Sequence, residues 1–238
     1  MKLSIIMPIF SETESVKKIV KEVKEMLGER LFEIIFVVAP KSAPESIKVC
    51  NDLAQNDKKI RFYFQKNNPG VGRAYREGFE YVSGDYALLL DGDGQNDLRT
   101  IPLMVDKILS ENLDLVVASR WIKDGGVDLN SYGVRKYILN RIFNSVVRIL
   151  YRTGVHDLTF SYKLIRAHLI KSIQWEGVGF ELNAETTLKP IRYGYRVGEV
   201  PSKIKDRKEG ESKYSLIAAL KYIPMSLKIL FLKKQYDR

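Results

Sequence analysis

Short apolar runs and amphipathic stretches alternate along the first half of this 238-residue chain. The apolar runs are typical of buried strands and fall at residues 3–8, 33–38, 60–64, 86–90 and 113–118. Apolar residues three and four positions apart indicate helices at residues 11–27, 45–55, 70–82 and 98–110. Ser11 and Glu14 have the spacing of a capping box at the first helix. The alternation predicts an α/β fold, a mostly parallel sheet with helices on both faces.

The pattern changes after Arg120. A loop at residues 124–128 precedes a long basic helix predicted over residues 131–151, and strands with a short helix follow as far as residue 200. Residues 201–213 are polar and charged, which predicts a loop.

The tail is apolar at spacings of three and four over residues 214–232, with Lys221, Pro224 and Lys228 interrupting it. These interruptions make it a poor membrane span, which needs about 20 mostly apolar residues. It is expected to form amphipathic helices that lie on a membrane surface or a partner, or else dock on the domain's own core.

The net charge of +10 is concentrated in the second half of the chain. Residues 1–114 carry 16 Lys and Arg against 18 Asp and Glu, whereas residues 115–175 carry 10 against 3 and residues 201–238 carry 10 against 4. This excess predicts a phosphate or polyanion partner for the second half. A complete α/β core without a nucleic-acid-binding motif argues against nucleic acid. The single cysteine, Cys50, and the lack of a signal-peptide pattern predict a cytoplasmic setting.

Two carboxylates follow the apolar run at residues 86–90, in the sequence Asp91-Gly92-Asp93-Gly94-Gln95. The carboxyl ends of parallel strands open into the ligand crevice of such sheets. Alternate residues of an extended chain share a face, so Asp91 and Asp93 are expected on one side. Their oxygens, with the carbonyl of Gln95, suit Mg²⁺ or Mn²⁺, and a solvated acidic turn is the alternative.

Several motifs in order resemble family 2 glycosyltransferases of the GT-A fold, over about residues 2–215. Within that family the chain looks most like the dolichol-phosphate mannose synthase and polyprenyl-phosphate glycosyltransferase branch. The motifs that carry the resemblance are Pro8-Ile9-Phe10-Ser11-Glu12, Asn68-Pro69-Gly70-Val71-Gly72-Arg73-Ala74, Asp91-Gly92-Asp93-Gly94-Gln95, Ala118-Ser119-Arg120-Trp121, Asp157-Leu158-Thr159-Phe160-Ser161-Tyr162-Lys163, Gly179-Phe180-Glu181-Leu182-Asn183-Ala184-Glu185, and Asp206-Arg207 with Gly210-Glu211-Ser212-Lys213.

The resemblance implies a Rossmann-like GT-A catalytic domain over residues 1–213, followed by an amphipathic basic tail at residues 214–238. It implies an inverting, metal-dependent transfer of a sugar from GDP-mannose or a UDP-hexose to a polyprenyl phosphate. Asp93 and Gln95 would hold the metal. The expected catalytic residues are Asp91, Asp93, Arg120 and Arg207. The expected donor-binding residues are Pro8, Phe10, Glu12, Gly70, Arg73, Asp91 and Gly92. The expected acceptor-phosphate cations are Arg120, Arg135, Arg141, Arg207 and Lys213.

One departure from the family pattern concerns the second strand. The family usually places two acids after it, and this chain has Ala39 and Pro40 there. A catalytically degenerate nucleotide-sugar-binding subunit is therefore one alternative. Another is a saccharide acceptor, which would need a carboxylate base such as Asp157, Glu181 or Glu185.

The same resemblance implies partners and a location. A lipid acceptor would place the protein at the cytoplasmic face of a membrane as a peripheral enzyme, alone or with a small membrane-protein partner. The donor nucleotide, the sugar and the oligomeric state stay open at this stage.

Overall fold

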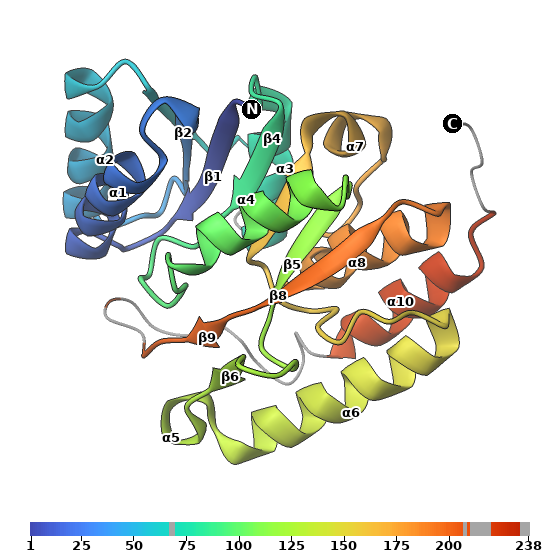
Figure 1. Cartoon of the computed structure of the whole chain (residues 1–238). Helices are drawn as coiled ribbons and strands as arrows, with labels where there is room; N and C mark the ends of the chain where they lie inside the picture. Colours follow the sequence, from blue (N-terminus) through green and yellow to red (C-terminus); the bar gives the residue numbers. More distant parts are fainter. Residues whose placement is uncertain (67–69, 207–208, 210–219, 234–238) are drawn as a thin grey trace.

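The computed structural model describes residues 1–66, 70–206, 209 and 220–233 (Figure 1). The strands of the central sheet are β1 (Leu3–Ile9), β2 (Leu31–Val38), β3 (Ile60–Phe64), β4 (Tyr86–Leu89), β5 (Leu115–Ser119), β7 (Lys163–Arg166) and β8 (Val197–Pro201). They form a 7-stranded sheet in the order β3-β2-β1-β4-β7-β5-β8. Only β7 runs antiparallel to its neighbours within this sheet. The predicted mostly parallel α/β sheet is confirmed.

Helices cover both faces of the sheet, because successive strand residues point to opposite sides. The main helices are α1 (Glu14–Leu27), α2 (Pro44–Asn56), α3 (Val71–Tyr81), α4 (Thr100–Ser110), α6 (Val134–Tyr151), α7 (Ala167–Ser172), α8 (Glu181–Tyr193) and α10 (Tyr222–Leu230). Ile5 and Met7 of β1 belong to the core under α1, α2 and α4. Ile6 of β1 belongs to the second core, with residues of α3, α7 and α8.

The start of α1 differs from the sequence prediction. Thr13 is its N-cap residue and makes no side-chain capping bond, so the predicted capping box is wrong. The carboxylate of Glu209 accepts hydrogen bonds from the backbone N–H groups of Thr13, Glu14 and Ser15, at 2.7, 3.0 and 3.2 Å. Burial raises the pKa of Glu209, but these hydrogen bonds outweigh it and lower the pKa to about 2. The helix terminus is thus satisfied by a residue distant in the sequence.

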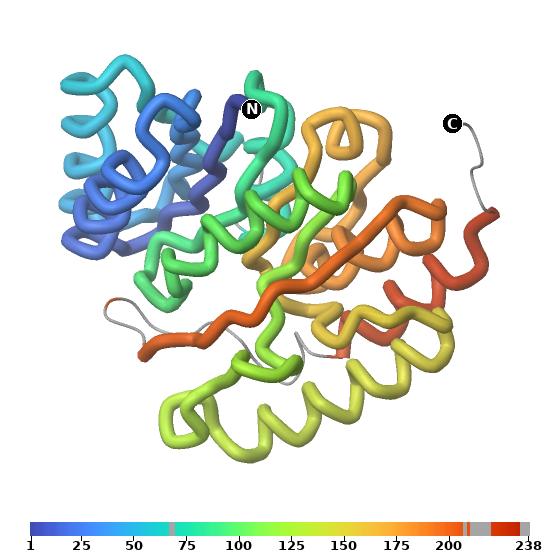
Figure 2. The backbone as a smooth tube through the Cα atoms, in the orientation of Figure 1, coloured from blue at the N-terminus to red at the C-terminus, as the bar shows by residue number. Residues whose placement is uncertain are grey.

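The predicted helix over residues 131–151 is interrupted near its start. A short helix, α5, covers Leu129–Tyr132. It is followed by Gly133, where φ is +85°, and α6 begins at Val134. A positive φ is readily adopted by glycine, so Gly133 lets the chain turn between the two helices. α6 then runs along one edge of the molecule (Figure 2).

Part of the predicted loop at residues 201–213 is ordered. Lys203–Ile204 forms β9, which pairs in parallel with β6 (Gly126–Val127). Lys205 continues this segment and donates its backbone N–H to the carbonyl of Gln95 at 2.9 Å. Of the remaining residues to 213, 207–208 and 210–213 lie outside the described part of the chain.

The C-terminal helix α10 docks on the domain's own core through one of its faces. Its buried residues are Tyr222, Ser226 and Ile229. The Tyr151 hydroxyl of α6 donates to the carbonyl of Ser226 at 2.6 Å. The predicted tail therefore packs on the domain over its described part, and residues 214–219 and 234–238 lie outside it. Among the described residues, none of the helices has both the length and the apolar character needed to cross a bilayer.

Candidate active site

A cavity of about 960 Å³ opens at the carboxyl ends of β1, β2 and β4. Its lining comes from both halves of the chain. The residues that line it include Pro8, Phe10, Glu12, Ala39, Gln65, Gly70, Asp91, Gly92, Asp93, Gln95, Arg120, Tyr132, Lys136, Asn140, Ser161, Phe180, Asn183, Asp206 and Tyr222.

Asp91 is held in a fixed orientation in the cavity wall. The Tyr75 hydroxyl donates to one carboxylate oxygen and the Ser161 hydroxyl to the other, each at 2.7 Å. Its backbone N–H donates to Asn96 Oδ1 at 3.0 Å. Burial, reinforced by the charge of Asp91, raises the pKa of Tyr75 well above its usual value. Tyr75 therefore stays a hydrogen-bond donor and, with Ser161, fixes the orientation of the Asp91 side chain.

Asp93 and Gln95 lie in the turn that follows Asp91. The backbone N–H of Gln95 donates to Asp93 Oδ1 at 3.0 Å, and the Asp93 side chain is only 5% exposed. Gln95 Nε2 donates to the carbonyl of Lys205 at 3.3 Å, which identifies Oε1 as the acceptor atom of this amide. One hydrogen bond within the turn and one to the Lys205 segment hold the turn in place.

This oxygen-rich turn fits a divalent cation that a diphosphate helps to hold. The described residues contain no group of three or more His, Cys, Asp or Glu side chains placed to hold a metal. Mg²⁺ is usually bound by one or two carboxylates and by substrate phosphates. Asp93 and Gln95 could supply oxygen ligands of that kind, and a nucleoside diphosphate would have to supply the rest.

Arg120 lies in the cavity wall but is tied to Asp157. Its Nε and Nη2 donate to the two oxygens of the fully buried Asp157 at 2.6 and 2.8 Å. Further bonds reach the hydroxyls of Tyr132 and Thr159, each at 3.0 Å. Burial lowers the pKa of Arg120, but the Asp157 carboxylate outweighs it and raises the pKa. Arg120 fixes the residue 157–161 loop, which carries Ser161.

The acceptor cations expected from sequence fall in different places. Arg135 and Arg141 are exposed on α6 and do not line the cavity. Arg141 instead stacks over the Trp121 ring, with its guanidinium carbon 5.3 Å from the ring centroid. Lys136, one residue from Arg135, is half-buried and lines the cavity. Arg207 and Lys213 lie outside the described residues.

The spacing of residues in the sequence could have predicted that Lys136 lines the cavity. Tyr132, Lys136 and Asn140 are four residues apart and all line the cavity. Side chains at that spacing share one face of a helical segment. The spacing therefore identifies the face of the basic segment that meets the site.

Most expected donor residues line the cavity, namely Pro8, Phe10, Glu12, Gly70, Asp91 and Gly92. Glu12 Oε2 accepts from the backbone N–H groups of Phe10 and Ser11 at 2.7 and 3.0 Å, which shapes the turn after β1. Arg73 is not part of the lining, and its backbone N–H donates to the carbonyl of Val178 at 3.3 Å.

The glycines at the start of α3 allow a close backbone approach. A Cβ atom at Gly70 would lie 2.4 Å from the carbonyl oxygen of Val178, and one at Gly72 would lie 2.5 Å from that of Gly179. These contacts explain both glycines without a phosphate. They also place Phe180 and Asn183 of the neighbouring segment at the cavity.

Two further groups were not predicted. Tyr222 brings the C-terminal helix into the cavity lining, which no local pattern reveals. Lys163 is fully buried, and its ammonium group donates to the carbonyl of Asn183 and to Thr186 Oγ1. Burial lowers the pKa of Lys163 to about 7. Through these hydrogen bonds Lys163 stabilises the first turns of α8.

A mostly parallel sheet with a metal-type carboxylate turn at its carboxyl edge is the architecture of GT-A glycosyltransferases. This chain belongs to glycosyl transferase family 2, whose family model matches residues 4–174. It is accordingly a glycosyltransferase.

Two curated relatives are similar over most of the chain. Polyprenol monophosphomannose synthase from Mycolicibacterium smegmatis is 26% identical over 220 residues, which cover 89% of this chain and 80% of that protein. Glycosyltransferase AglD from Haloferax volcanii is 25% identical over 222 residues, which cover 91% of this chain. The chain spans 35% of the length of AglD.

The fold is shared with glucosyl-3-phosphoglycerate synthase from Mycobacterium tuberculosis, solved with Mn²⁺, UDP and phosphoglyceric acid. The TM-score is 0.73 at 14% identity, and the match covers 98% of this chain and 80% of that chain. The same enzyme has also been solved with Mg²⁺ and UDP.

Proposed function

We propose that this enzyme transfers a sugar from a nucleoside diphosphate donor to a polyprenyl phosphate, with inversion at the anomeric carbon. The observation that carries the proposal is the reach of one cavity. It extends from the Asp91–Gln95 turn to Lys136 of α6 and to Tyr222 of α10. The relative named polyprenol monophosphomannose synthase, which this chain covers over 80% of its length, supports the choice of acceptor.

At the donor end, Asp93 and Gln95 would hold Mg²⁺ or Mn²⁺. The ion would neutralise charge on the departing diphosphate. Asp91, fixed by Tyr75 and Ser161, is oriented to position the donor sugar. Asp93 is the metal-binding carboxylate in this assignment, and Asp91 is the positioning one.

At the acceptor end, a phosphate monoester is already an anionic nucleophile near neutral pH. One of its oxygens forms the new bond to the anomeric carbon as the bond to the diphosphate oxygen breaks, and no proton has to be removed. The protein has to bind and aim this phosphate. Lys136 supplies a cation in the cavity wall. Arg120 also lines the cavity, with its charge largely balanced by the pair with Asp157.

Two of the carboxylates named as possible bases for a sugar hydroxyl are held in ion pairs. The third, Glu181, is held through one oxygen, and its Oε2 is buried without a hydrogen-bond partner among the described residues. Asp157 pairs with Arg120, and Glu185 pairs with Lys189 at 2.5 Å. Glu181 Oε1 accepts from the N–H groups of Val178 and Gly179, each at 3.0 Å. The cavity lining includes none of these three. This favours a phosphate acceptor over a saccharide.

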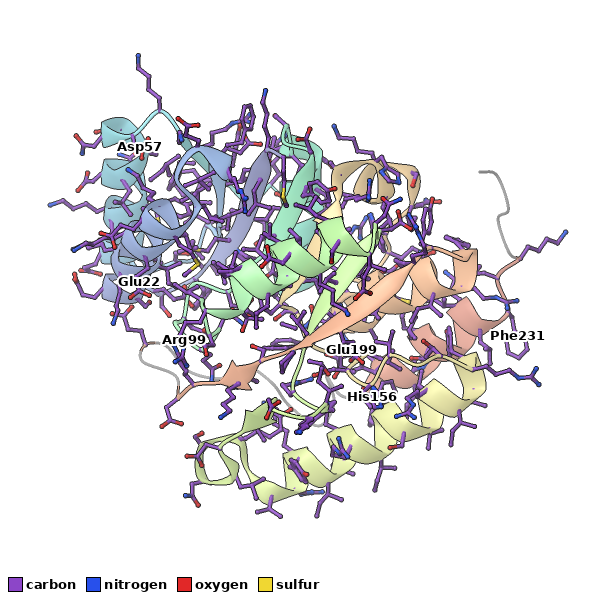
Figure 3. All side chains as sticks on the ribbon, viewed as in Figure 1. Glu22, Asp57, Arg99, His156, Glu199 and Phe231 are labelled. Atoms are coloured by element: carbon purple, nitrogen blue, oxygen red, sulfur yellow. The ribbon has the colours of Figure 1, made fainter. Side chains whose placement is uncertain are left out.

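A lipid acceptor requires contact with a membrane, and α6 and α10 present a suitable surface. We call this surface the apolar face. Its exposed residues are Val134, Ile138, Leu139, Ile142, Val146, Ile149, Leu150, Leu220, Ile223, Leu227 and Phe231. Phe231 is 80% exposed and points away from the domain (Figure 3). Arg135, Arg141, Arg152 and Lys221 are also exposed along these segments.

An exposed apolar face flanked by Lys and Arg is suited to a bilayer that contains anionic lipid. We therefore propose that the enzyme is a peripheral protein at the cytoplasmic membrane face, alone or with a small membrane-protein partner. The lipid phosphate would then reach the cavity beside α6.

The test is transfer of radiolabelled mannose from GDP-mannose, or glucose from UDP-glucose, to a short polyprenyl phosphate in vesicles. Label should enter the lipid phase only with Mg²⁺ or Mn²⁺. Asp93→Asn should lose at least about 100-fold in turnover. Asp106→Asn, at an exposed position of α4, is the matched control and should match the wild type.

Two other outcomes of this experiment would support the alternative functions. Label in an added saccharide and not in lipid would make the acceptor a sugar. Donor binding without transfer or hydrolysis would favour the degenerate binding subunit suggested by Ala39 and Pro40.

A further inference from the structure

One end of the cavity lies along the carboxyl ends of three adjacent strands. Ile9 of β1 is opposite Val38 of β2, which is opposite Phe64 of β3. The next residues continue this register, because the Ala39 N–H donates to Ile9 at 3.0 Å and the Gln65 N–H to Val38 at 2.8 Å. Ala39 and Gln65 are therefore held side by side in the cavity lining.

Gln65 has one half of its amide already committed. Its Nε2 donates to the carbonyl of Gly70 at 3.2 Å. A carbonyl can only accept, so this contact fixes which end of the amide is nitrogen. None of the described residues donates a hydrogen bond to Gln65 Oε1. The residue is 3% exposed and lines the cavity, so a group bound in the cavity can donate a hydrogen bond to this oxygen.

Pro8, Ile9, Ala39, Val71 and Ala74 contribute an apolar lining to the cavity, and Ser11 adds a hydroxyl. Glu12 is also present, but its Oε2 holds the turn after β1. Ala39 occupies the position where the family pattern expects an acid. An apolar slot with one oriented carbonyl suits a flat heterocycle that carries an N–H group.

We propose that Gln65 determines the base specificity of the donor by accepting a hydrogen bond from the ring N–H of uracil or guanine. Uracil N3–H and guanine N1–H are donors at the Watson–Crick edge. Cytosine N3 and adenine N1 carry a lone pair at the corresponding position, which would face the lone pairs of Oε1. The inference rests on the proposed function, since it requires a nucleoside diphosphate donor.

The test measures binding of UDP, GDP, CDP and ADP with Mn²⁺ by titration calorimetry. The wild type should bind UDP or GDP at least about tenfold more tightly than CDP and ADP, because mismatched polar groups lose a hydrogen bond. The comparison of UDP with GDP then identifies the ring. Gln65→Leu should weaken binding of the preferred nucleotide by about tenfold and leave CDP and ADP nearly unchanged. Gln55→Leu, at an exposed position of α2, is the matched control.

A ligand-side measurement keeps the test independent of variant folding. The preferred nucleotide methylated at its ring N–H (N3-methyl-UDP or N1-methyl-GDP) should bind the wild type at least about tenfold more weakly. Equal affinity for all four bases, or a Gln65→Leu variant with unchanged preference, would overturn the inference and leave the proposed function standing. A wild-type protein that binds none of the four would count against both.

Discussion

The guanidinium of Arg120 and the carboxylate of Asp157 form a two-point ion pair beneath the cavity, at 2.6 and 2.8 Å. Asp157 is fully buried and Arg120 is 6% exposed. Removing one partner of such a pair leaves the other buried without its counter-charge, which is more costly than the pair itself is favourable. Arg120 is thus a structural member of the site as well as a source of charge.

Arg120→Met is expected to lower the free energy of unfolding by about 3–5 kcal/mol, because it strands the Asp157 carboxylate. Urea unfolding followed by circular dichroism measures this change. Arg141→Met removes an exposed arginine from α6 and should cost under about 1 kcal/mol. Equal losses in the two variants would show that the pair does not support the fold.

Removal of the metal is expected to weaken binding of the nucleoside diphosphate and to leave binding of the free nucleoside unchanged. The reason is that, in the proposed site, Asp93 and Gln95 would contact the diphosphate only through the ion. Calorimetry with and without EDTA should show a loss of about tenfold or more for the diphosphate. An EDTA-insensitive affinity for the diphosphate would argue against a metal at this turn.

Protonation of Glu209 is expected to destabilise the start of α1 in acid. The pKa of Glu209 is lowered to about 2, against 4.5 for an unperturbed glutamate. A carboxylate with a lowered folded-state pKa contributes stability above about pH 4.5, and this contribution is lost as the pH falls towards 2. Glu209→Gln should cost about 1 kcal/mol at pH 7, as for loss of a helix cap.

The difference between wild type and Glu209→Gln should therefore shrink as the pH falls from 4.5 towards 2, in urea unfolding at several pH values. Glu22→Gln is the control, since Glu22 lies on the outer surface of α1 (Figure 3). A constant difference across this range would mean that Glu209 does not cap the helix through its charge.

Gly72→Ala should destabilise the junction between α3 and the segment before α8. Alanine usually favours a helix over glycine, but here its Cβ would lie 2.5 Å from the carbonyl oxygen of Gly179. Overpacking of this kind costs about 1–3 kcal/mol, measured as a lower midpoint of thermal unfolding. Gly154→Ala meets no atom within 4 Å and should leave the midpoint nearly unchanged. A stabilised Gly72→Ala variant would contradict the close packing.

The apolar face is expected to bind vesicles that contain anionic lipid. Ile142→Ser with Ile149→Ser should reduce cosedimentation several-fold, because both side chains are more than half exposed, and should change stability little. Leu103→Ser with Leu109→Ser removes comparably exposed apolar side chains from α4, outside the apolar face. Binding that is lost equally in both double variants would remove the support for α6 as the membrane surface.

The fold could largely be predicted from local pattern. The strand predicted at residues 60–64 coincides with β3, and the other predicted strands overlap β1, β2, β4 and β5. An apolar run indicates a strand that is buried on both faces of a sheet. This prediction does not depend on how the individual side chains pack. The antiparallel direction of β7 was not predicted, since strand direction depends on the chain's path between strands.

The candidate site was predicted only in part. The cavity position of the Asp91–Gln95 turn could be predicted because its polar residues are neighbours in sequence and follow a recognisable strand. The acceptor side was predicted less well, since Lys136 lines the cavity and Arg135 and Arg141 do not. A helix brings every third or fourth residue to one face, and charge alone does not say which face meets the cavity.

The sequence by itself determined the alternating α/β elements, the oxygen-rich turn after β4 and the concentration of positive charge in the second half. Each of these is encoded by residues close together in the chain. The tertiary structure alone decided that Glu209 caps α1, that Asp157 ties Arg120, and that Tyr222 lines the cavity. Such partners are set by which segments the fold brings together, because a hydrogen bond or ion pair depends on distance in space and not on separation along the chain.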